Sequence, residues 1–331
     1  MSAARASRLI MKGMTMPEMR KLGESGLVTP RLVLGGNVFG STARGEDAYA
    51  VLDRFIAAGG TMIDTADVYS AWVPGHHGGE SETLLGEWLK RRGRRDDVLI
   101  ATKVGMLAGE GGEKLEPARI AAAIEASLGR LGTDYVDLYY AHQDDSDTPL
   151  EESLAAFDRL VKDGKVRALG ASNYSAARLE QALDLAARMG ITPYTVLQPE
   201  YNLVSRDRFE GALQRLCVAR GIGVLPYFGL ASGFLTGKYR SQADFGKSPR
   251  GERMHEYLNP GGLAVLSALD EVAAEAGASQ AQVALAWVAA QPGVTAPIAS
   301  ANRVAQLEDL LGAMELELSA DQVERLSRAA A

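Results

Sequence analysis

Eight short apolar runs alternate with segments of helical periodicity along the chain, and this alternation most constrains the fold. Apolar runs of this length, bounded by turn residues and separated by helical segments, predict parallel strands joined by helices. The predicted strands cover residues 32–36, 61–66, 98–103, 135–142, 166–173, 194–202, 222–227 and 294–300.

The predicted helices lie between these strands and carry start and stop residues. Ser81 is the expected N-cap of one helix and Gly93 its stop, while Pro117 occupies the first turn of the next, where a missing amide hydrogen costs nothing. The helices cover residues 45–58, 81–92, 116–131, 149–164, 175–190, 206–221, 263–277, 280–291, 303–314 and 319–329, with a long loop at 228–260.

Eight strand–helix alternations without an intervening linker predict a (β/α)8 TIM barrel with C-terminal helices. A doubly wound open sheet is the alternative on pattern alone, but it usually has a Gly-rich first turn when it binds a dinucleotide. We expect a single domain over residues 18–331, preceded by a short N-terminal extension. Residues 1–17 are basic and lack the apolar core of a signal peptide, so we expect a disordered leader or a misassigned start, with a transit peptide as the alternative.

The composition excludes several classes of partner. The net charge is −7, with both signs interspersed, which argues against nucleic acid and anionic membranes as partners. The apolar runs are too short to span a bilayer. Cys217 is the single cysteine of the chain, which excludes an internal disulfide and favours a cytoplasmic location. The oligomeric state cannot be inferred from the sequence.

Four ionisable side chains fall at or just beyond the C-terminal ends of predicted strands: Asp64, Tyr69, Lys103 and His142. In a barrel of parallel strands these ends gather on one face and build the active site. We therefore expect the four groups to lie together. An acid, a phenol, an amine and an imidazole favour a proton-transfer site over a binding module.

The four groups suit the protonation of an alkoxide that forms on a ketone or aldehyde, or the reverse reaction. The Lys103 cation is expected to favour the anion of Tyr69, whose ordinary pKa is near 10, and Asp64 to hold the lysine charged. His142 is expected to orient a carbonyl oxygen. Each residue alone also fits a structural role, but their coincidence favours function. Because no side chain supplies hydride, a cofactor must do so.

An ordered set of segments resembles the aldo-keto reductase superfamily over about residues 18–325. The segments are DTADVYS (64–70), GGESETLLGEWL (78–89), ATKVG (101–105), DLYYAHQDD (137–145), GKVRALGASNYS (164–175), QPEYNL (198–203) and LPYFGLASGFLTGKY (225–239). The resemblance implies a barrel that binds NADPH across its C-terminal mouth. It also implies a catalytic tetrad of Asp64, Tyr69, Lys103 and His142, with Tyr69 as general acid/base.

The resemblance further implies the residues that contact the cofactor. Ser172, Asn173 and Gln198 are expected at the nicotinamide carboxamide, and Tyr227 is expected to stack on the nicotinamide ring. Glycines allow close backbone approach to a pyrophosphate, and a lysine adds charge. The residues expected there are Gly229, Leu230, Ser232, Gly233, Leu235, Gly237 and Lys238.

The sequence departs from the family pattern in two places. Where many relatives carry a Gly-Ala-Arg-like run, this chain has Ser300, Asn302 and Arg303, then Gln306, so the arginine is shifted by one. We favour NADP(H) as cofactor, with NAD(H) as the alternative. The connection after Tyr69 is also longer than usual, and its Trp72, His76 and His77 are expected to wall the substrate pocket. The paired histidines also suit a metal site, but with no cysteine nearby and four histidines in the whole chain the ligand count is low, and no metal is expected.

Other mechanisms fit the sequence less well. A short-chain dehydrogenase needs a lysine four residues after a tyrosine, and this chain has none. A metal-dependent hydrolase needs more histidines and carboxylates at strand ends. A Schiff base on Lys103 remains open. The sequence predicts an NADP(H)-dependent oxidoreductase that interconverts a small-molecule carbonyl and an alcohol. The alternative is a non-catalytic NADP(H)-binding regulatory or redox-sensing relative, like the channel-associated β subunits of the superfamily.

Overall fold

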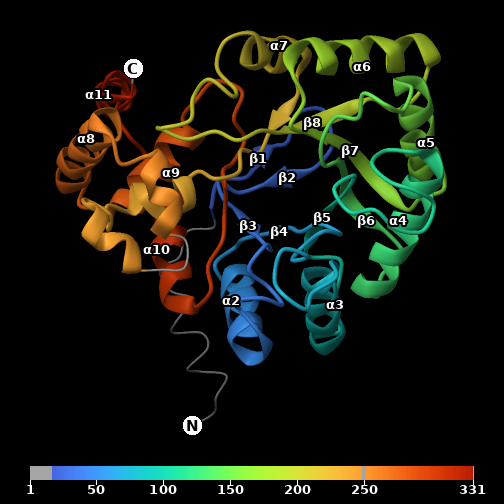
Figure 1. The fold of residues 1–331 in the computed structure, drawn as a ribbon, viewed down its shortest axis with the longest axis horizontal. Helices are drawn as coiled ribbons and strands as arrows, with labels where there is room; N and C mark the ends of the chain where they lie inside the picture. Colours follow the sequence, from blue (N-terminus) through green and yellow to red (C-terminus); the bar gives the residue numbers. More distant parts are fainter. Residues whose placement is uncertain (1–16, 248–250, 331) are drawn as a thin grey trace.

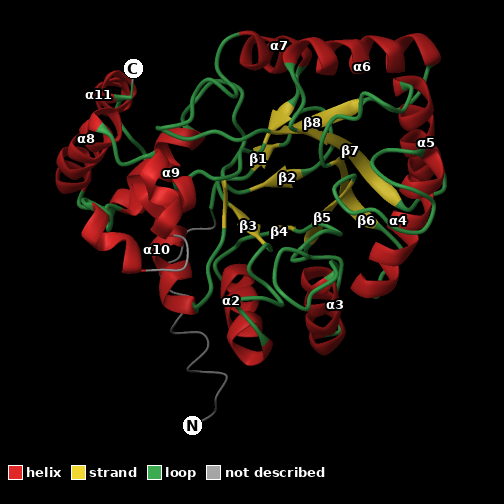
Figure 2. Ribbon diagram, in the orientation of Figure 1, coloured by secondary structure: helices red, strands yellow, loops and turns green. Residues whose placement is uncertain are grey.

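The computed structural model describes residues 17–247 and 251–330, in which parallel strands form a ring surrounded by helices (Figures 1 and 2). The strand order is β10-β3-β4-β5-β6-β7-β8-β9. The ring closes between β9 and the segment that leads into β10. There the Thr295 amide donates to Val224 O at 2.9 Å and the Ile298 amide to Pro226 O at 2.8 Å. This closure confirms the predicted (β/α)8 barrel and excludes the open sheet.

The elements follow the predicted order. The barrel strands are β3 (Val33–Gly35), β4 (Met62–Asp64), β5 (Leu99–Val104), β6 (Val136–Ala141), β7 (Val166–Ser172), β8 (Tyr194–Gln198), β9 (Gly223–Val224) and β10 (Ile298–Ala299). The α-helices are α2 (Gly45–Ala57), α3 (Glu80–Arg92), α4 (Pro117–Leu131), α5 (Leu150–Lys162), α6 (Ala176–Met189), α7 (Ala212–Arg220), α8 (Pro260–Ala276), α9 (Gln280–Ala289), α10 (Val304–Glu315) and α11 (Ala320–Ala329). The predicted long loop contains the 3₁₀ segments η1 (Ala231–Thr236), η2 (Gln242–Lys247) and η3 (Gly251–Glu256).

Several local predictions were wrong. Helix α3 begins at Glu80 after Gly79, and Ser81 is not its N-cap. Instead the buried Ser81 hydroxyl donates to Gly36 O at 2.8 Å, which ties α3 to the chain after β3. Helix α7 begins at Ala212, six residues later than predicted. The sequence analysis also missed an antiparallel hairpin of β1 (Arg20–Lys21) and β2 (Val28–Thr29).

That hairpin closes the N-terminal end of the barrel. Its Leu22 and Leu27 pack with barrel residues such as Met62 and Leu138 in one apolar cluster. The Glu24 amide donates to Gly221 O at 3.2 Å, just before β9. A second, larger cluster fills the layer between the strands and the surrounding helices. The apolar hairpin thus plugs the N-terminal end of the barrel.

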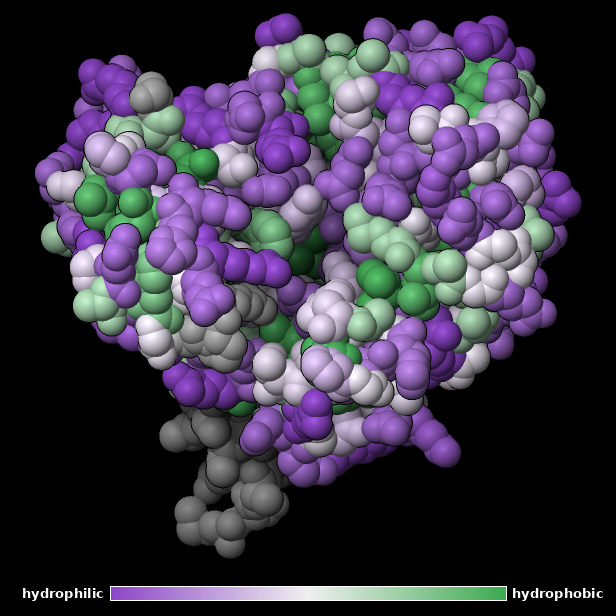
Figure 3. Space-filling view, in the orientation of Figure 1, coloured by the Kyte–Doolittle hydropathy of each residue, from purple (hydrophilic) through white to green (hydrophobic). Residues whose placement is uncertain are grey.

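Of the predicted leader, only Pro17 lies within the described residues. No helix in the described part of the chain is both long and apolar enough to cross a membrane. Figure 3 shows polar side chains over most of one face, with apolar residues exposed around a central hollow.

Candidate active site

Lys103 is the centre of the site, because it contacts two other members of the predicted tetrad. Asp64 ends β4 and Lys103 lies in the neighbouring strand β5, so the parallel pairing brings the two side chains to the same end of the barrel. The Lys103 ammonium donates to Asp64 Oδ1 at 2.5 Å, to the Thr65 carbonyl at 2.7 Å and to the Tyr69 hydroxyl at 3.3 Å. The predicted grouping of Asp64, Lys103 and Tyr69 is therefore present in the structure.

Electrostatics hold Lys103 in its charged form. Its side chain is fully buried, and burial by itself disfavours the ammonium. The Asp64 carboxylate and the Tyr69 oxygen outweigh burial, so the pKa of Lys103 is raised above its ordinary value. A cation is thus maintained next to the phenol oxygen.

Tyr69 differs from the expectation in one respect. Burial raises the pKa of Tyr69 above 10, and the opposing effect of Lys103 offsets this only in part. The lysine was expected to favour the phenolate, but desolvation of the buried hydroxyl outweighs its effect. The phenol is therefore protonated at neutral pH, which is the state that a proton donor needs.

His142 follows β6 and lies against Tyr69. The ring centroids are 5.8 Å apart and the rings meet at 71°. Burial, and then the Lys103 charge, lower the pKa of His142 well below its ordinary value, so the imidazole is neutral. Its buried Nδ1 has no hydrogen-bond partner among the described residues. All four members of the predicted tetrad therefore converge at the C-terminal end of β4, β5 and β6.

The residues predicted at the nicotinamide form a hydrogen-bonded chain that reaches the tetrad. The Gln198 side-chain amide donates to Asp64 Oδ2 at 2.8 Å, and the Ser172 hydroxyl donates to Gln198 O at 2.8 Å. Asn173 has a left-handed backbone with φ of 59° and donates to His142 O at 3.0 Å. The Tyr227 hydroxyl donates to Asn173 Oδ1 at 2.8 Å. The link from Gln198 to Asp64 was not predicted, and no sequence signal indicates it.

The segment predicted at the pyrophosphate immediately follows Tyr227. Ala231, Ser232 and Gly233 have φ of 46°, 56° and 99°, so consecutive residues turn through left-handed conformations. Gly229 and Leu235 are buried, whereas Leu230 and Gly237 are half-buried. Lys238 is exposed, its Nζ lies 5.0 Å from the Tyr239 ring, and no ion pair involves it within residues 17–247 and 251–330.

The residues predicted at the adenine end lie around the N-terminus of α10. The Ser300 hydroxyl donates to Asn37 Oδ1 at 2.7 Å, and the Thr42 hydroxyl donates to Asn302 Oδ1 at 2.9 Å. The Gln306 side chain accepts from the Asn302 amide at 2.9 Å. Arg303 is exposed and forms no ion pair in the described part of the chain.

The loop predicted to wall the substrate pocket is organised by Glu80, which sequence reasoning missed. The Glu80 carboxylate accepts from the amides of Ser70, His77 and Gly78 at 3.0, 2.7 and 3.1 Å. Trp72 is 57% exposed, and its ring meets the Tyr69 ring edge-on with centroids 5.5 Å apart. The structure thus places Trp72 beside the tetrad.

The two loop histidines have different surroundings. His76 Nδ1 lies 3.0 Å from the Ser70 hydroxyl and 3.9 Å from Glu80 Oε2, while His77 is exposed. No group of three or more His, Cys, Asp or Glu side chains suited to a metal ion occurs among the described residues.

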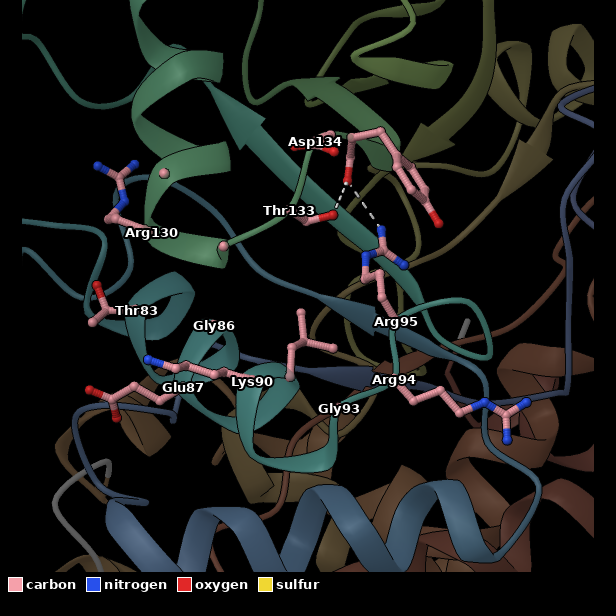
Figure 4. A pocket seen from close by; sticks show the side chains of 14 residues that line it. Thr83, Gly86, Glu87, Lys90, Gly93, Arg94, Arg95, Arg130, Thr133 and Asp134 are labelled. Atoms are coloured by element: carbon pink, nitrogen blue, oxygen red, sulfur yellow. Dashed lines mark hydrogen bonds between the residues drawn. The ribbon is translucent and has the colours of Figure 1, made fainter.

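A large recess of about 660 Å³ lies away from these groups (Figure 4). It is bounded by the C-terminal parts of α3 and α4 and by the start of β6, with Lys90, Arg94, Arg95 and Arg130 among its lining residues. None of the tetrad residues lines it. The recess and the tetrad are therefore separate features of the molecule.

The chain matches known proteins over almost its whole length. The model of the Aldo/keto reductase family matches residues 31–331. The aldo-keto reductase yakc of Schizosaccharomyces pombe, whose name carries NADP(+), is 32% identical over 86% of this chain and 82% of its own.

Two further relatives carry different names. The L-glyceraldehyde 3-phosphate reductase of Escherichia coli K12 is 33% identical over 90% of this chain and 87% of its own. A probable voltage-gated potassium channel subunit beta of Oryza sativa is 33% identical over 90% of this chain and 92% of its own. The match to the family model and the identity with these relatives agree with the resemblance found in the sequence, and the chain belongs to the aldo/keto reductase family.

Proposed function

We propose that this protein is an NADP(H)-dependent oxidoreductase that reduces an aldehyde or ketone to an alcohol, or catalyses the reverse reaction, with Tyr69 as the general acid/base. The observation that carries the proposal is the position of Lys103 Nζ, which contacts both Asp64 and the Tyr69 hydroxyl. Family membership supports the general reaction class. The finer assignment rests on the chemistry of the four side chains.

Each side chain has a role in the reduction. Tyr69 donates its proton to the carbonyl oxygen, and the Lys103 ammonium stabilises the negative charge that develops on the phenol oxygen. Asp64 holds Lys103 in place and keeps it charged. The neutral imidazole of His142 carries one ring N–H, which can donate a hydrogen bond that orients the carbonyl oxygen.

Two features fit a nicotinamide dinucleotide. Asn173 and Tyr227 are hydrogen-bonded to each other next to His142, so an amide and an aromatic ring lie beside the tetrad. The left-handed turn at Ala231, Ser232 and Gly233 resembles the concave turns that bind phosphate, although the amides of Ala231 and Gly233 donate to the carbonyls of Phe228 and Leu230. When bound, the nicotinamide supplies the hydride that no side chain can supply. The name of the Schizosaccharomyces pombe relative favours NADP(H) over NAD(H).

Replacing the proton donor tests this proposal. Tyr69→Phe removes the hydroxyl and keeps the ring, so we expect turnover to fall by about 10²–10⁴-fold while NADPH binding, measured by calorimetry, changes little. Tyr49→Phe is the matched control, because the Tyr49 hydroxyl donates to Glu87 on the outer helices, away from the tetrad. A Tyr69→Phe variant with near-normal turnover on a panel of carbonyls would refute the assignment.

The substrate-side role of the loop after Tyr69 is a second part of the proposal. Trp72 contacts Tyr69 and is largely exposed, so it is available to contact a substrate. We expect Trp72→Ala to raise KM for aromatic carbonyls more than for small aliphatic ones. Equal effects on both classes would argue against a wall formed by Trp72.

A non-catalytic regulatory role is the alternative, because a potassium channel β subunit is among the relatives. The two functions differ in turnover. NADPH oxidation with carbonyl substrates, or NADP⁺ reduction with alcohols, supports the enzyme. Tight binding of NADPH with no turnover on either panel would favour the regulatory protein.

A further inference from the structure

Arg119 at the start of α4 joins two loops at the C-terminal end of the barrel. Its guanidinium donates through Nη2 to Asp67 Oδ2 at 3.3 Å, through Nε to Leu107 O at 3.0 Å and through Nη1 to Glu110 O at 3.2 Å. Asp67 belongs to the loop after β4 that carries Tyr69. Leu107 and Glu110 belong to the loop after β5. Arg119 is 6% exposed, so these contacts are largely shielded from water.

The loop after β5 is shaped around this guanidinium. A Cβ on Gly109 would lie 2.7 Å from Arg119 Nη1, so the loop backbone lies close against the guanidinium. Gly109 and Gly112 pair through two backbone hydrogen bonds of 3.0 and 3.1 Å, which fold the loop back on itself. The loop therefore depends on Arg119 for its packing.

The two loops also meet directly at Gly78. A Cβ on Gly78 would lie 2.7 Å from Asp67 O and 2.8 Å from Leu107 Cδ2, and the residue has φ of 94°. The segment that carries Trp72 thus rests on Asp67 and Leu107. Both of these residues are held by Arg119, one through its side chain and the other through its carbonyl.

Asp67 transmits this restraint to the tetrad. It lies two residues before Tyr69, and its amide donates to Lys103 O at 3.2 Å. The Asp67 side chain is fully buried, and its Oδ1 has no hydrogen-bond partner among the described residues. The contact with Arg119 is the side-chain hydrogen bond that fixes this carboxylate.

We propose that Arg119 is a positioning residue that holds the Tyr69 loop and the substrate-side segment 70–79 in one arrangement. Loss of its three-way contact lets Tyr69 leave the reach of Lys103, which lowers kcat, and loosens the segment around Trp72, which raises KM. The inference rests on the proposed function, because it takes Tyr69 as the proton donor.

Arg119→Lys tests the proposal. Lysine keeps the charge but cannot bond three separate acceptors in the fixed geometry of a guanidinium. Trp72 reports on the loop without any substrate, because Trp88 and Trp287 are at most 1% exposed whereas Trp72 is 57% exposed. We expect the acrylamide quenching constant to rise by less than about twofold, because Trp72 is already more than half exposed. We expect kcat/KM to fall by up to about 10²-fold, the loss that a misplacement of about 1 Å can cause.

Arg95→Lys is the matched control at the opposite end of the same strands. Arg95 donates to Asp137 Oδ2 at 2.7 Å and to the carbonyl of Val98. It also donates to the carbonyl of Tyr135 at 3.2 Å (Figure 4). It is therefore another arginine with one carboxylate and two carbonyl partners. We expect Arg95→Lys to reduce the midpoint of thermal unfolding to a similar extent, without a change in Trp72 quenching or in kcat/KM.

Leu107→Ala provides a second test of the proposal in case Arg119→Lys does not fold. This variant cuts the contact with Gly78 and leaves the buried ion pair intact, so we expect a raised quenching constant and a raised KM in a folded protein. Unchanged quenching and unchanged kinetics, in Leu107→Ala or in a folded Arg119→Lys, would overturn the proposal. A failure of the proposed function can be told apart from a failure of this proposal, because Tyr69→Phe would then keep its turnover whatever the Trp72 quenching shows.

Discussion

The Gln198 side-chain amide donates a hydrogen bond of 2.8 Å to Asp64 Oδ2, and both residues are buried. The other oxygen of the same carboxylate accepts from Lys103. Asp64 therefore connects the residues proposed to bind the nicotinamide with the residue that stabilises the Tyr69 oxygen. A substitution at the nicotinamide end of these hydrogen bonds is therefore expected to alter the tetrad, and a substitution in the tetrad to alter cofactor binding.

Gln198→Met tests this connection. The change leaves Asp64 Oδ2 buried without its donor, which costs about 1–3 kcal/mol of unfolding free energy. We expect kcat to fall and NADPH to bind more weakly, because the same side chain serves both. Gln291→Met is the control, since the Gln291 side-chain amide donates to Trp287 O in the outer layer, away from the tetrad. Normal kcat with weakened NADPH binding would assign Gln198 to the cofactor alone.

Removal of the Lys103 ammonium is expected to affect both stability and activity. Lys103→Met leaves the Asp64 carboxylate buried and unpaired, and breaking one side of a buried pair costs about 3–5 kcal/mol. We expect a lower denaturation midpoint and a loss of turnover comparable to that of Tyr69→Phe. A double variant, Lys103→Met with Asp64→Asn, should recover much of the stability and none of the turnover. Recovered turnover in the double variant would contradict the role of the ammonium.

Asp67 is expected to make the stability of the protein depend on pH. Burial, and then repulsion from Glu82, raise the pKa of Asp67 to about 7, although Arg119 and Arg130 lower it in part. In the unfolded chain the pKa of an aspartate is about 3.9, so between these values the folded protein holds more protons than the unfolded one. Asp67 therefore leaves the unfolding free energy at its highest below about pH 4, and this free energy falls as the pH rises towards 7.

Asp67→Asn should remove this dependence. We expect the midpoint of thermal unfolding to decline less between pH 5 and pH 8 in the variant than in the wild type. Burial, and then the charge of Asp67, raise the pKa of Tyr139 well above its ordinary value, so this phenol is neutral throughout this range and does not contribute. Parallel curves for the two proteins would show that Asp67 has an ordinary pKa in the folded state.

Arg303 is expected to discriminate between the two dinucleotides. Its exposed guanidinium forms no ion pair within residues 17–247 and 251–330, so it is available to a 2′-phosphate. We expect Arg303→Ala to weaken NADPH binding about tenfold, the equivalent of one charge-assisted hydrogen bond of about 1.5 kcal/mol, with little change for NADH. Arg188→Ala, another exposed arginine at the end of α6, controls for net charge. Equal losses for both dinucleotides would remove the phosphate role.

The sequence predicted the barrel because the alternation of strands and helices can be recognised from short local segments. Each barrel strand and each α-helix except α7 was located to within a few residues, and the position of Asp64, Lys103 and His142 at strand ends indicated that they would meet. The same reasoning missed the β1–β2 hairpin, because two-residue strands leave almost no periodicity. It misplaced the N-cap of α3, because Ser81 is engaged by Gly36 O, far away in the sequence.

The sequence by itself therefore determined the strand order, the family and the identity of the four central side chains, since these follow from local pattern and motif. Only the tertiary structure decided how those side chains are charged and held. The protonated state of Tyr69, the neutral ring of His142, the link between Gln198 and Asp64 and the contacts of Arg119 all depend on burial and on partners that are distant along the chain. Desolvation and long-range contacts have no local signature, and for that reason they could not be derived from the order of residues.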